Sequence, residues 1–232
     1  MITIRTAAER GHAEHGWLDS WHTFSFGGYR DPRWVGYGKL RVINEDRVAP
    51  GAGFAPHSHQ DMEIISYVLD GRLRHRDSTG GGSVIVHGEL QLMTAGRGIS
   101  HSEMNDSQTE PVHFLQIWVV PSVTGAAPGY QQRALDPEAM RAGFAKVVAP
   151  QAEGALFAIH QDARLFVAWP AAGTVLHQTL AAGRKCYLHV ARGAARLAAL
   201  ELSAGDAAMI EGEAALELLA QQDSELLLFD LA

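Results

Sequence analysis

Residues 57–71 read His-Ser-His-Gln-Asp-Met-Glu-Ile-Ile-Ser-Tyr-Val-Leu-Asp-Gly, and they combine two signals of a β protein. The run 63–69 is rich in β-branched residues and ends at Asp70-Gly71, a pair typical of a hairpin turn. The segment His57-Ser58-His59 places two imidazoles at i and i+2, and only an extended strand projects such a pair to one side. This stretch therefore predicts strands that carry metal-ligand side chains.

A second segment, His101-Ser102-Glu103, has the same spacing of two ligand-type residues around one serine. Helical metal sites use i, i+4 spacing, as in the H-E-x-x-H motif, and neither segment has it. Two strands of one barrel would bring three imidazoles and one carboxylate around a first-row divalent ion and leave coordination positions open. Such a site can hold a substrate and dioxygen.

The chain has 12 histidines, and most histidines in any protein bind no metal. Those without a partner at the i, i+2 spacing are interpreted as surface or locally hydrogen-bonded residues. They are His12, His15, His22, His75, His87, His113, His160, His177 and His189. The candidate ligands are therefore confined to the two paired segments.

Composition indicates two small all-β domains. The length of 232 residues exceeds one average domain of ~150 residues. With 47% hydrophobic residues and 24 glycines, the chain can bury sizeable cores and form many turns. The formal net charge is −7, and the alternation of Arg72, Arg74 and Arg76 is typical of a solvated strand face. We therefore expect no direct nucleic-acid binding.

The chain lacks the signals of export or membrane insertion. Cys186 is the only cysteine and lies in an apolar run, so we expect a buried, inert thiol and no intrachain disulfide. Residues 1–16 have no apolar core of a secretory signal, and no apolar stretch approaches the ~18 residues of a membrane span. A cytoplasmic location without membrane contact is the prediction.

Short strands separated by turns recur along the first half. They are predicted at 38–46, 63–69, 72–76, 83–86, 90–93 and 112–120. The glycine-rich turns at 80–82 and 96–98 are not followed by a helix, so they do not form phosphate loops. This pattern predicts a barrel or a sandwich.

From Ser122 to about Gly154 the strand pattern stops, which predicts an interdomain connection with one short helix. Asp136 can cap that helix, Pro137 suits its first position and Gly143 can end it. The predicted domains are residues 1–121, a connection at 122–154, and residues 155–232.

The last third is similar to the first half. The run 187–193 matches 67–71, and 205–209 matches 88–93, which predicts a duplicated barrel. These matches put Thr179 and Ala181 opposite His57 and His59, and Leu218 and Ala220 opposite His101 and Glu103. We therefore expect the second barrel to be metal-free.

The first paired segment resembles the first motif of the cupins, G-x5-H-x-H-x3-E. Gly51, His57, His59 and Glu63 fall in the expected places, and Gly71 closes the motif one residue late. The second cupin motif is looser. Gly88 and Gly96 fit, but Thr94 replaces the usual proline and His101 comes two residues later than in that motif.

Three stretches, 21–26, 54–59 and 93–103, are similar to the pirin family of bicupins, including its bacterial quercetinase-like members. The resemblance covers nearly the whole chain. It implies an all-β fold with two cupin barrels, of the double-stranded β-helix or jelly-roll type, and a short interdomain helix.

The resemblance also implies a metal held by His57, His59, His101 and Glu103. In an ordinary cupin the fourth ligand would instead be Glu63, four residues after the second histidine. We favour Glu103, because the extra residues before His101 shift the register of that segment. Glu63 then becomes a residue that supports the ligands or a carboxylate at the barrel mouth.

The family expectation for the metal is Fe(II), while Mn, Co, Ni, Cu and Zn also suit nitrogen and oxygen ligands. The implied activity is a quercetin 2,3-dioxygenase reaction, in which a flavonol and dioxygen react, the central ring opens and carbon monoxide leaves. Glu103 would serve as ligand and as catalytic base. The alternative is a non-catalytic, iron-dependent redox-sensing regulator that binds a protein partner.

Overall fold

The computed structural model describes residues 1–232, and almost all of its regular structure is β-strand. The strands form four sheets, two of seven strands and two of four. The chain divides into two compact units. We call residues 11–135 and 159–161 the N-terminal barrel, and residues 1–10, 136–158 and 162–232 the C-terminal barrel. The predicted all-β fold class is confirmed.

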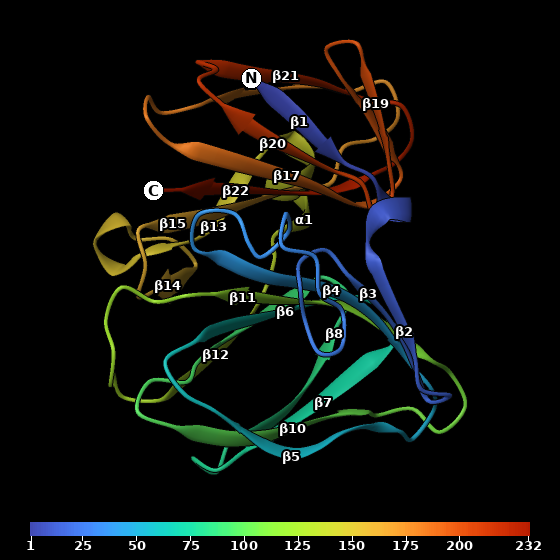
Figure 1. The fold of residues 1–232 in the computed structure, drawn as a ribbon, viewed down its shortest axis with the longest axis vertical. Coiled ribbons are helices and arrows are strands. Elements are labelled where there is room, and N and C mark those ends of the chain that lie inside the picture. The colour runs from blue at the N-terminus through green and yellow to red at the C-terminus, as the bar shows by residue number, and fades with distance from the viewer. The chain divides into compact units, whose positions relative to one another are not determined.

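The N-terminal barrel contains one large and one small sheet. Its strands are β2 (Gly11–Glu14), β3 (Leu18–His22), β4 (Leu40–Val48), β5 (Gly53–His59), β6 (Glu63–Asp70), β7 (Arg72–Asp77), β8 (Gly82–Val86), β9 (Glu89–Thr94), β10 (Ile99–Asn105), β11 (Val112–Val119) and β12 (Gly129–Ala134). The large sheet has the order β12-β9-β6-β11-β4-β3-β2, and the small sheet has the order β5-β10-β7-β8 (Figure 1).

Burial explains why these segments form strands. In β6, every residue except Asp70 is buried, as expected for a β-branched run in the middle of a sheet. One apolar cluster joins both sheets and contains Leu18, Val48, Val68, Leu73, Ile85, Val112 and Phe114. Each such side chain contributes roughly 1.5–3 kcal/mol of burial free energy. In β10 the odd-numbered residues 99–105 are buried, so its His101 and Glu103 face inward.

The turn at Asp70-Gly71 is a corner between sheets, and the hairpin prediction was wrong. β6 pairs with β9 and β11, whereas β7 pairs with β8 and β10. Gly71 has φ +80°, and a Cβ there would lie 2.6 Å from the carbonyl oxygen of Pro111. The corner therefore requires glycine, because two backbones approach closely there.

The C-terminal barrel also contains one large and one small sheet. Its strands are β1 (Ile2–Arg5), β13 (Ala145–Pro150), β14 (Phe157–Ile159), β15 (Ala163–Ala168), β16 (Val175–Thr179), β17 (Lys185–Arg192), β18 (Ala194–Leu197), β19 (Leu200–Ser203), β20 (Ala207–Glu211), β21 (Ala215–Ala220) and β22 (Glu225–Leu231). The sheet orders are β1-β20-β17-β22-β15-β13-β14 and β16-β21-β18-β19. Cys186 is buried in its apolar core, as predicted, and burial raises the pKa of the thiol to about 11.

The strand orders confirm the predicted duplication. The order β9-β6-β11-β4 of one large sheet recurs as β20-β17-β22-β15 in the other, and β5-β10-β7-β8 recurs as β16-β21-β18-β19. Gly193 lies at the corner between β17 and β18 with φ +78°, and a Cβ there would lie 2.4 Å from the carbonyl oxygen of Asp223. It is therefore the counterpart of Gly71.

The predicted equivalents of the ligand residues were wrong in register. Strand pairing aligns Leu218 with Glu103, because Leu218 faces Leu197 as Glu103 faces His75. Two residues earlier in each strand, Leu216 aligns with His101.

The same comparison corrects the other strand. Leu216 faces Gln178 as His101 faces His57, so Gln178 and Leu180 take the places predicted for Thr179 and Ala181. The loops of the two barrels differ in length, so counting residues from the matched glycines put the wrong residues opposite the ligands. Leucine side chains offer no ligand atom, so the aligned positions carry a single polar group, the amide of Gln178.

The helices are short. The predicted helix is confirmed as α1 (Pro137–Ala142), where the side chain of Asp136 accepts a hydrogen bond from the backbone N–H of Glu138 and Gly143 follows the last turn. Two 3-10 helices lie at Ala7–Glu9 and Gln151–Glu153. None of the helices has both the length and the apolar character needed to cross a membrane.

Strand pairing divides the chain differently from the predicted limits of 1–121, 122–154 and 155–232. The segment 122–154 contains strand β12 of the N-terminal barrel and strand β13 of the C-terminal barrel, in addition to the helix. Strand β1 pairs with β20, so the first residues of the chain belong to the C-terminal barrel. Long-range pairing of this kind leaves no local signal in the sequence.

The corner glycine provides a test of the fold. We expect Gly71→Ala to lower the free energy of unfolding by about 2–4 kcal/mol, because it adds a steric clash to the strain of a positive φ. Gly80→Ala is the control, since Gly80 has φ +89° but no atom within 4 Å of the added Cβ. It should cost only about 1 kcal/mol. Equal losses in urea denaturation would contradict the corner interpretation.

Candidate metal centre

Two neighbouring strands carry the predicted ligands. His57 and His59 lie on β5, His101 and Glu103 lie on β10, and His57 is directly opposite His101 in the sheet. The prediction that the i, i+2 spacing belongs to strands is confirmed. The register of β5 against β10 shifts between His101 and Glu103, where a bulge interrupts the pairing.

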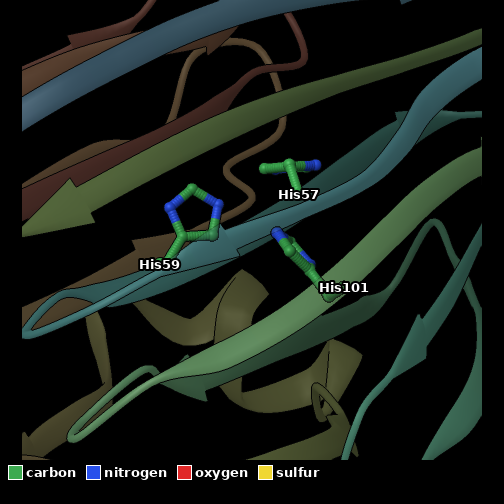
Figure 2. Close-up of side chains that lie close together, drawn as sticks. All are labelled: His57, His59 and His101. Carbon is green, nitrogen blue, oxygen red and sulfur yellow. The ribbon is translucent and has the colours of Figure 1, made fainter.

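The three imidazoles converge (Figure 2). The ring centroids of His57 and His101 are 4.5 Å apart, those of His57 and His59 are 4.8 Å apart, and those of His59 and His101 are 4.9 Å apart. One ligand atom from each of the three lies within 4.8 Å of the others. A second possible group of metal ligands, whose ligand atoms also lie within 4.8 Å of one another, contains His75, His101 and Glu103. His101 therefore belongs to both groups.

The donors suit a divalent ion. Nε2 of His101 is buried without a hydrogen-bond partner, and a buried polar atom of this kind calls for a ligand. Burial, reinforced by His57, lowers the pKa of His59 to about 4. Burial and the neighbouring His57 and His59 lower the pKa of His101 to about 3. Both rings are therefore neutral at pH 7, with a lone pair available to a metal.

Glu103 is buried in a shell of hydrogen bonds. Its Oε1 accepts from the hydroxyl of Ser66 at 3.0 Å, and its Oε2 accepts from Nε2 of Gln116 at 2.6 Å. Burial raises the pKa of Glu103, although the hydrogen bond from Ser66 acts in the opposite direction. Each carboxylate oxygen has a second lone pair for a further partner.

Glu63, the ordinary cupin ligand, has other partners and is outside both groups. Its side chain is fully buried, its Oε2 accepts from the hydroxyl of Thr94 at 2.9 Å, and its Oε1 lies 3.1 Å from Nδ1 of His160. Burial raises the pKa of Glu63. The interpretation of His160 as a surface or locally bonded residue was incomplete, because its half-exposed ring contacts a carboxylate far away in the sequence.

A cavity of about 180 Å³ opens beside the imidazoles. Phe26, Phe54 and Trp118 form apolar parts of its wall, and His57, His59 and Glu103 line it as well. Two other aromatic residues of this barrel, Phe24 and Phe114, are buried in the core and do not line the cavity. The cavity is therefore apolar on the sides and polar where the ligand residues lie.

Four further polar residues line the cavity and were missed in the sequence. The hydroxyl of Ser20 donates to Oδ1 of Asp46, and Nδ1 of His22 lies 3.0 Å from Oδ1 of Asn44. All four are buried, so His22 is not a surface residue. The sequence did contain a signal that these residues share one face of the sheet, namely i, i+2 spacing. Residues 20 and 22 have it on β3, and residues 44 and 46 have it on β4.

Another missed histidine, His75, is fully buried. It forms the second group with His101 and Glu103, and its Nε2 lies 3.0 Å from Oδ2 of Asp77. Strand alternation also contained this signal. Because Arg72, Arg74 and Arg76 point to one face of β7, His75 and Asp77 point to the other.

Asp46 gives the centre a measurable pH dependence. Burial raises the pKa of Asp46 to about 7, the hydrogen bond from Ser20 opposes the shift, and the charges of Glu103 and Glu45 add to it. Between about pH 4 and pH 7 the folded protein therefore holds a proton that the unfolded chain releases. The free energy of unfolding falls as the pH rises through this window.

Between pH 5 and pH 8, we expect the raised pKa of Asp46 to lower the free energy of unfolding by about 2–4 kcal/mol, and Asp46→Asn should abolish this pH-dependent decrease. Ser20→Ala should make the loss larger, because it removes the hydrogen bond that favours the carboxylate. Urea denaturation of metal-free protein at both pH values measures the effect. An unchanged pH dependence in both variants would show that Asp46 is ionised in the folded state at pH 5.

Family models match both halves of the chain. The Pirin model matches residues 3–119. The model described as quercetinase C-terminal cupin domain matches residues 146–231. The bicupin architecture expected from the sequence is thus confirmed.

Known proteins align along the whole length. The chain is 45% identical to quercetin 2,3-dioxygenase of Escherichia coli strain K12 over 233 residues, covering 100% of this chain and 99% of the relative. It is 39% identical to a pirin-like protein of Caulobacter vibrioides over 234 residues, covering 100% of both. The structure of the bacterial pirin YhhW from Escherichia coli in complex with nickel(II) superposes with a TM-score of 0.92 at 43% identity, covering 100% of this chain and 99% of that one. The chain belongs to the pirin family.

Proposed function

We propose that the N-terminal barrel holds one divalent metal ion on His57, His59, His101 and Glu103. The convergence of three imidazoles, two of which (His59 and His101) have pKa values lowered by burial, is the observation that carries this proposal. Glu103 is favoured over Glu63 as the carboxylate ligand for two reasons. One of its oxygens lies within 4.8 Å of a ring nitrogen of His101, and it lines the same cavity as His57 and His59. Glu63 is engaged by Thr94 and His160.

The proposed ion is Fe(II). Three nitrogen donors and one oxygen donor also suit Mn, Co, Ni, Cu and Zn, so affinity and supply decide which ion is bound. The solved Escherichia coli relative holds nickel(II), which fits the same donor set.

We further propose that the protein is a metal-dependent dioxygenase of the quercetin 2,3-dioxygenase type. Its substrate would be a flavonol such as quercetin, whose central ring opens with dioxygen and releases carbon monoxide. The name of the Escherichia coli relative and the pocket of apolar walls with a polar end support this assignment. The bound ion would supply Lewis acidity at the oxygen atoms of the substrate and a position for dioxygen.

The protein's own groups have distinct roles in this reaction. Glu103, which lines the cavity beside His57 and His59, takes the proton of the 3-hydroxyl. Ser66 and Gln116 hold that carboxylate in place through their hydrogen bonds. Phe26, Phe54 and Trp118 provide apolar surface for the flat rings and exclude water from them.

The fourth ligand can be identified by metal analysis of Glu103→Gln and Glu63→Gln. We expect Glu103→Gln to weaken binding of the ion by about 100-fold, or roughly 2.7 kcal/mol, because a neutral amide replaces a charged donor. Glu63→Gln should keep the metal within a few-fold of the unmodified protein. Metal content after dialysis and calorimetric titration with Co(II) or Ni(II) measure both. A larger loss in Glu63→Gln would restore the ordinary cupin ligand set.

Turnover is tested with iron-loaded protein and quercetin, by following oxygen uptake, carbon monoxide release and loss of the flavonol absorbance. A flavone without the 3-hydroxyl is the control substrate and should not react, because Glu103 then has no proton to remove. Per bound metal, Glu103→Gln should lower kcat by about 10²–10⁴-fold. No turnover of quercetin with any of the six metals would refute the proposed reaction.

A further inference from the structure

Strand β7 carries a buried pair that faces the ligand pair of β10. Asp77 lies directly opposite His101 in the sheet, and His75 lies directly opposite Glu103. The side chains of His75 and Asp77 are both 0% exposed. β10 is therefore flanked by β5, with two of the histidines in Figure 2, on one side and by a His-x-Asp pair on the other.

Hydrogen bonds link this pair to His101 in one chain. Oδ2 of Asp77 lies 3.0 Å from Nε2 of His75, and Nδ1 of His75 lies 3.4 Å from Nδ1 of His101. The other oxygen of Asp77 accepts from the backbone N–H of Thr79 at 2.8 Å and from its hydroxyl at 2.5 Å. The N–H of Gly81 is a further donor to it, at 3.3 Å. The turn after β7 thus holds the carboxylate in place.

This chain determines where the protons lie. Burial would raise the pKa of Asp77, but the hydrogen bonds from Thr79 and His75 outweigh it and keep that pKa below its ordinary value. A carboxylate only accepts, so Nε2 of His75 carries a proton. With the ring proton of His75 placed on Nε2, its Nδ1 is the acceptor in the contact with His101, and Nδ1 of His101 donates to it. Nε2 of His101 is left with a lone pair.

The free nitrogen of His101 is the one that the metal proposal needs. Nε2 of His101 is buried and has no hydrogen-bond partner. Figure 2 shows the far end of the His101 ring directed toward His57 and His59. A hydrogen bond at the other ring nitrogen is the usual way in which proteins orient a histidine ligand and set its tautomer.

His75 is itself close enough to be considered as a ligand, since it groups with His101 and Glu103. Both of its ring nitrogens are already engaged, one by Asp77 and the other by His101. It therefore has no free lone pair for an ion. Tyr130 stacks on the ring, with centroids 4.7 Å apart and planes at 29°, and helps to fix its orientation.

We propose that Asp77 and His75 are positioning residues that fix the tautomer of His101, so that its Nε2 faces the bound ion as a lone-pair donor. This inference rests on the proposed metal site. It adds two residues that touch neither the ion nor the substrate.

Asp77→Asn tests the chain with little change of shape. The amide oxygen is expected to stay with the N–H donors of Thr79 and Gly81, which leaves the amide NH₂ facing Nε2 of His75. His75 must then accept there and donate from Nδ1, so His101 accepts at Nδ1 and carries its proton on Nε2. The proton blocks the ligand atom, and the affinity for Ni(II) or Co(II) should fall about 10–100-fold.

Two further variants separate proton placement from packing. His75→Phe keeps the stack on Tyr130 but leaves His101 free to choose its tautomer, so its loss of affinity should be smaller than that of Asp77→Asn. Tyr130→Phe loses only the hydroxyl, which bonds Ser83 and Gln132, and its affinity should stay within about 2-fold of the unmodified protein. If Asp77 and His75 had a purely structural role, the order would be reversed. His75→Phe changes the side chain more than Asp77→Asn does, so it would then lower the metal affinity the most.

Calorimetric titration measures the affinities, and the nitrogen-15 shifts of the His101 ring in metal-free protein report its tautomer directly. We expect a protonated Nδ1 in the unmodified protein and a protonated Nε2 in Asp77→Asn. A protonated Nε2 in the unmodified protein, or equal metal affinity in Asp77→Asn, would overturn the inference. Failure of the unmodified protein to bind any divalent ion would instead refute the metal proposal, while the nitrogen shifts would still test the hydrogen-bond chain.

Discussion

The backbone register of strands β5, β10 and β7 is the constraint on which the centre depends. His57, His101 and Asp77 form one cross-strand row through this small sheet. A slip of one residue in any of the three strands would turn its side chains to the opposite face. The apolar cluster of Leu73, Ile85 and Phe114 therefore stabilises the site indirectly, because it holds the strands in the one register that brings the donors together.

The large sheet of the same barrel carries a second cross-strand row, which consists of polar residues. Gln91, Ser66, Gln116, Asn44 and His22 are successive cross-strand partners on β9, β6, β11, β4 and β3. All five are buried, so a polar band crosses an otherwise apolar interior. Two of them, Ser66 and Gln116, bond the carboxylate of Glu103. The barrel thus keeps a carboxylate in a buried site by supplying neutral donors instead of a counter-charge.

Local patterns were enough to predict most strands of the N-terminal barrel and part of the site, but not β12 and β13, which lie in the segment predicted to connect the domains. The i, i+2 spacing identified His57, His59, His101 and Glu103 as a set, and the cap at Asp136 identified the helix, because both signals lie within a few residues. The corner at Gly71, the burial of His75 and the contact of His160 with Glu63 depend on which strands become neighbours. Strand alternation shows which side chains share a face, but it does not show whether that face is covered by the other sheet.

Strand β1 precedes the N-terminal barrel in sequence but pairs with β20 of the C-terminal barrel, with Ile2 opposite Ile210. During synthesis β1 therefore has no partner until β20 has been made. The barrel that follows it in sequence can close earlier, since most of its pairing lies between residues 11 and 135. Strand β1 is therefore made before the N-terminal barrel but can be paired only after it, so the sheet that contains β1 is completed after the strands of the N-terminal barrel have been synthesised.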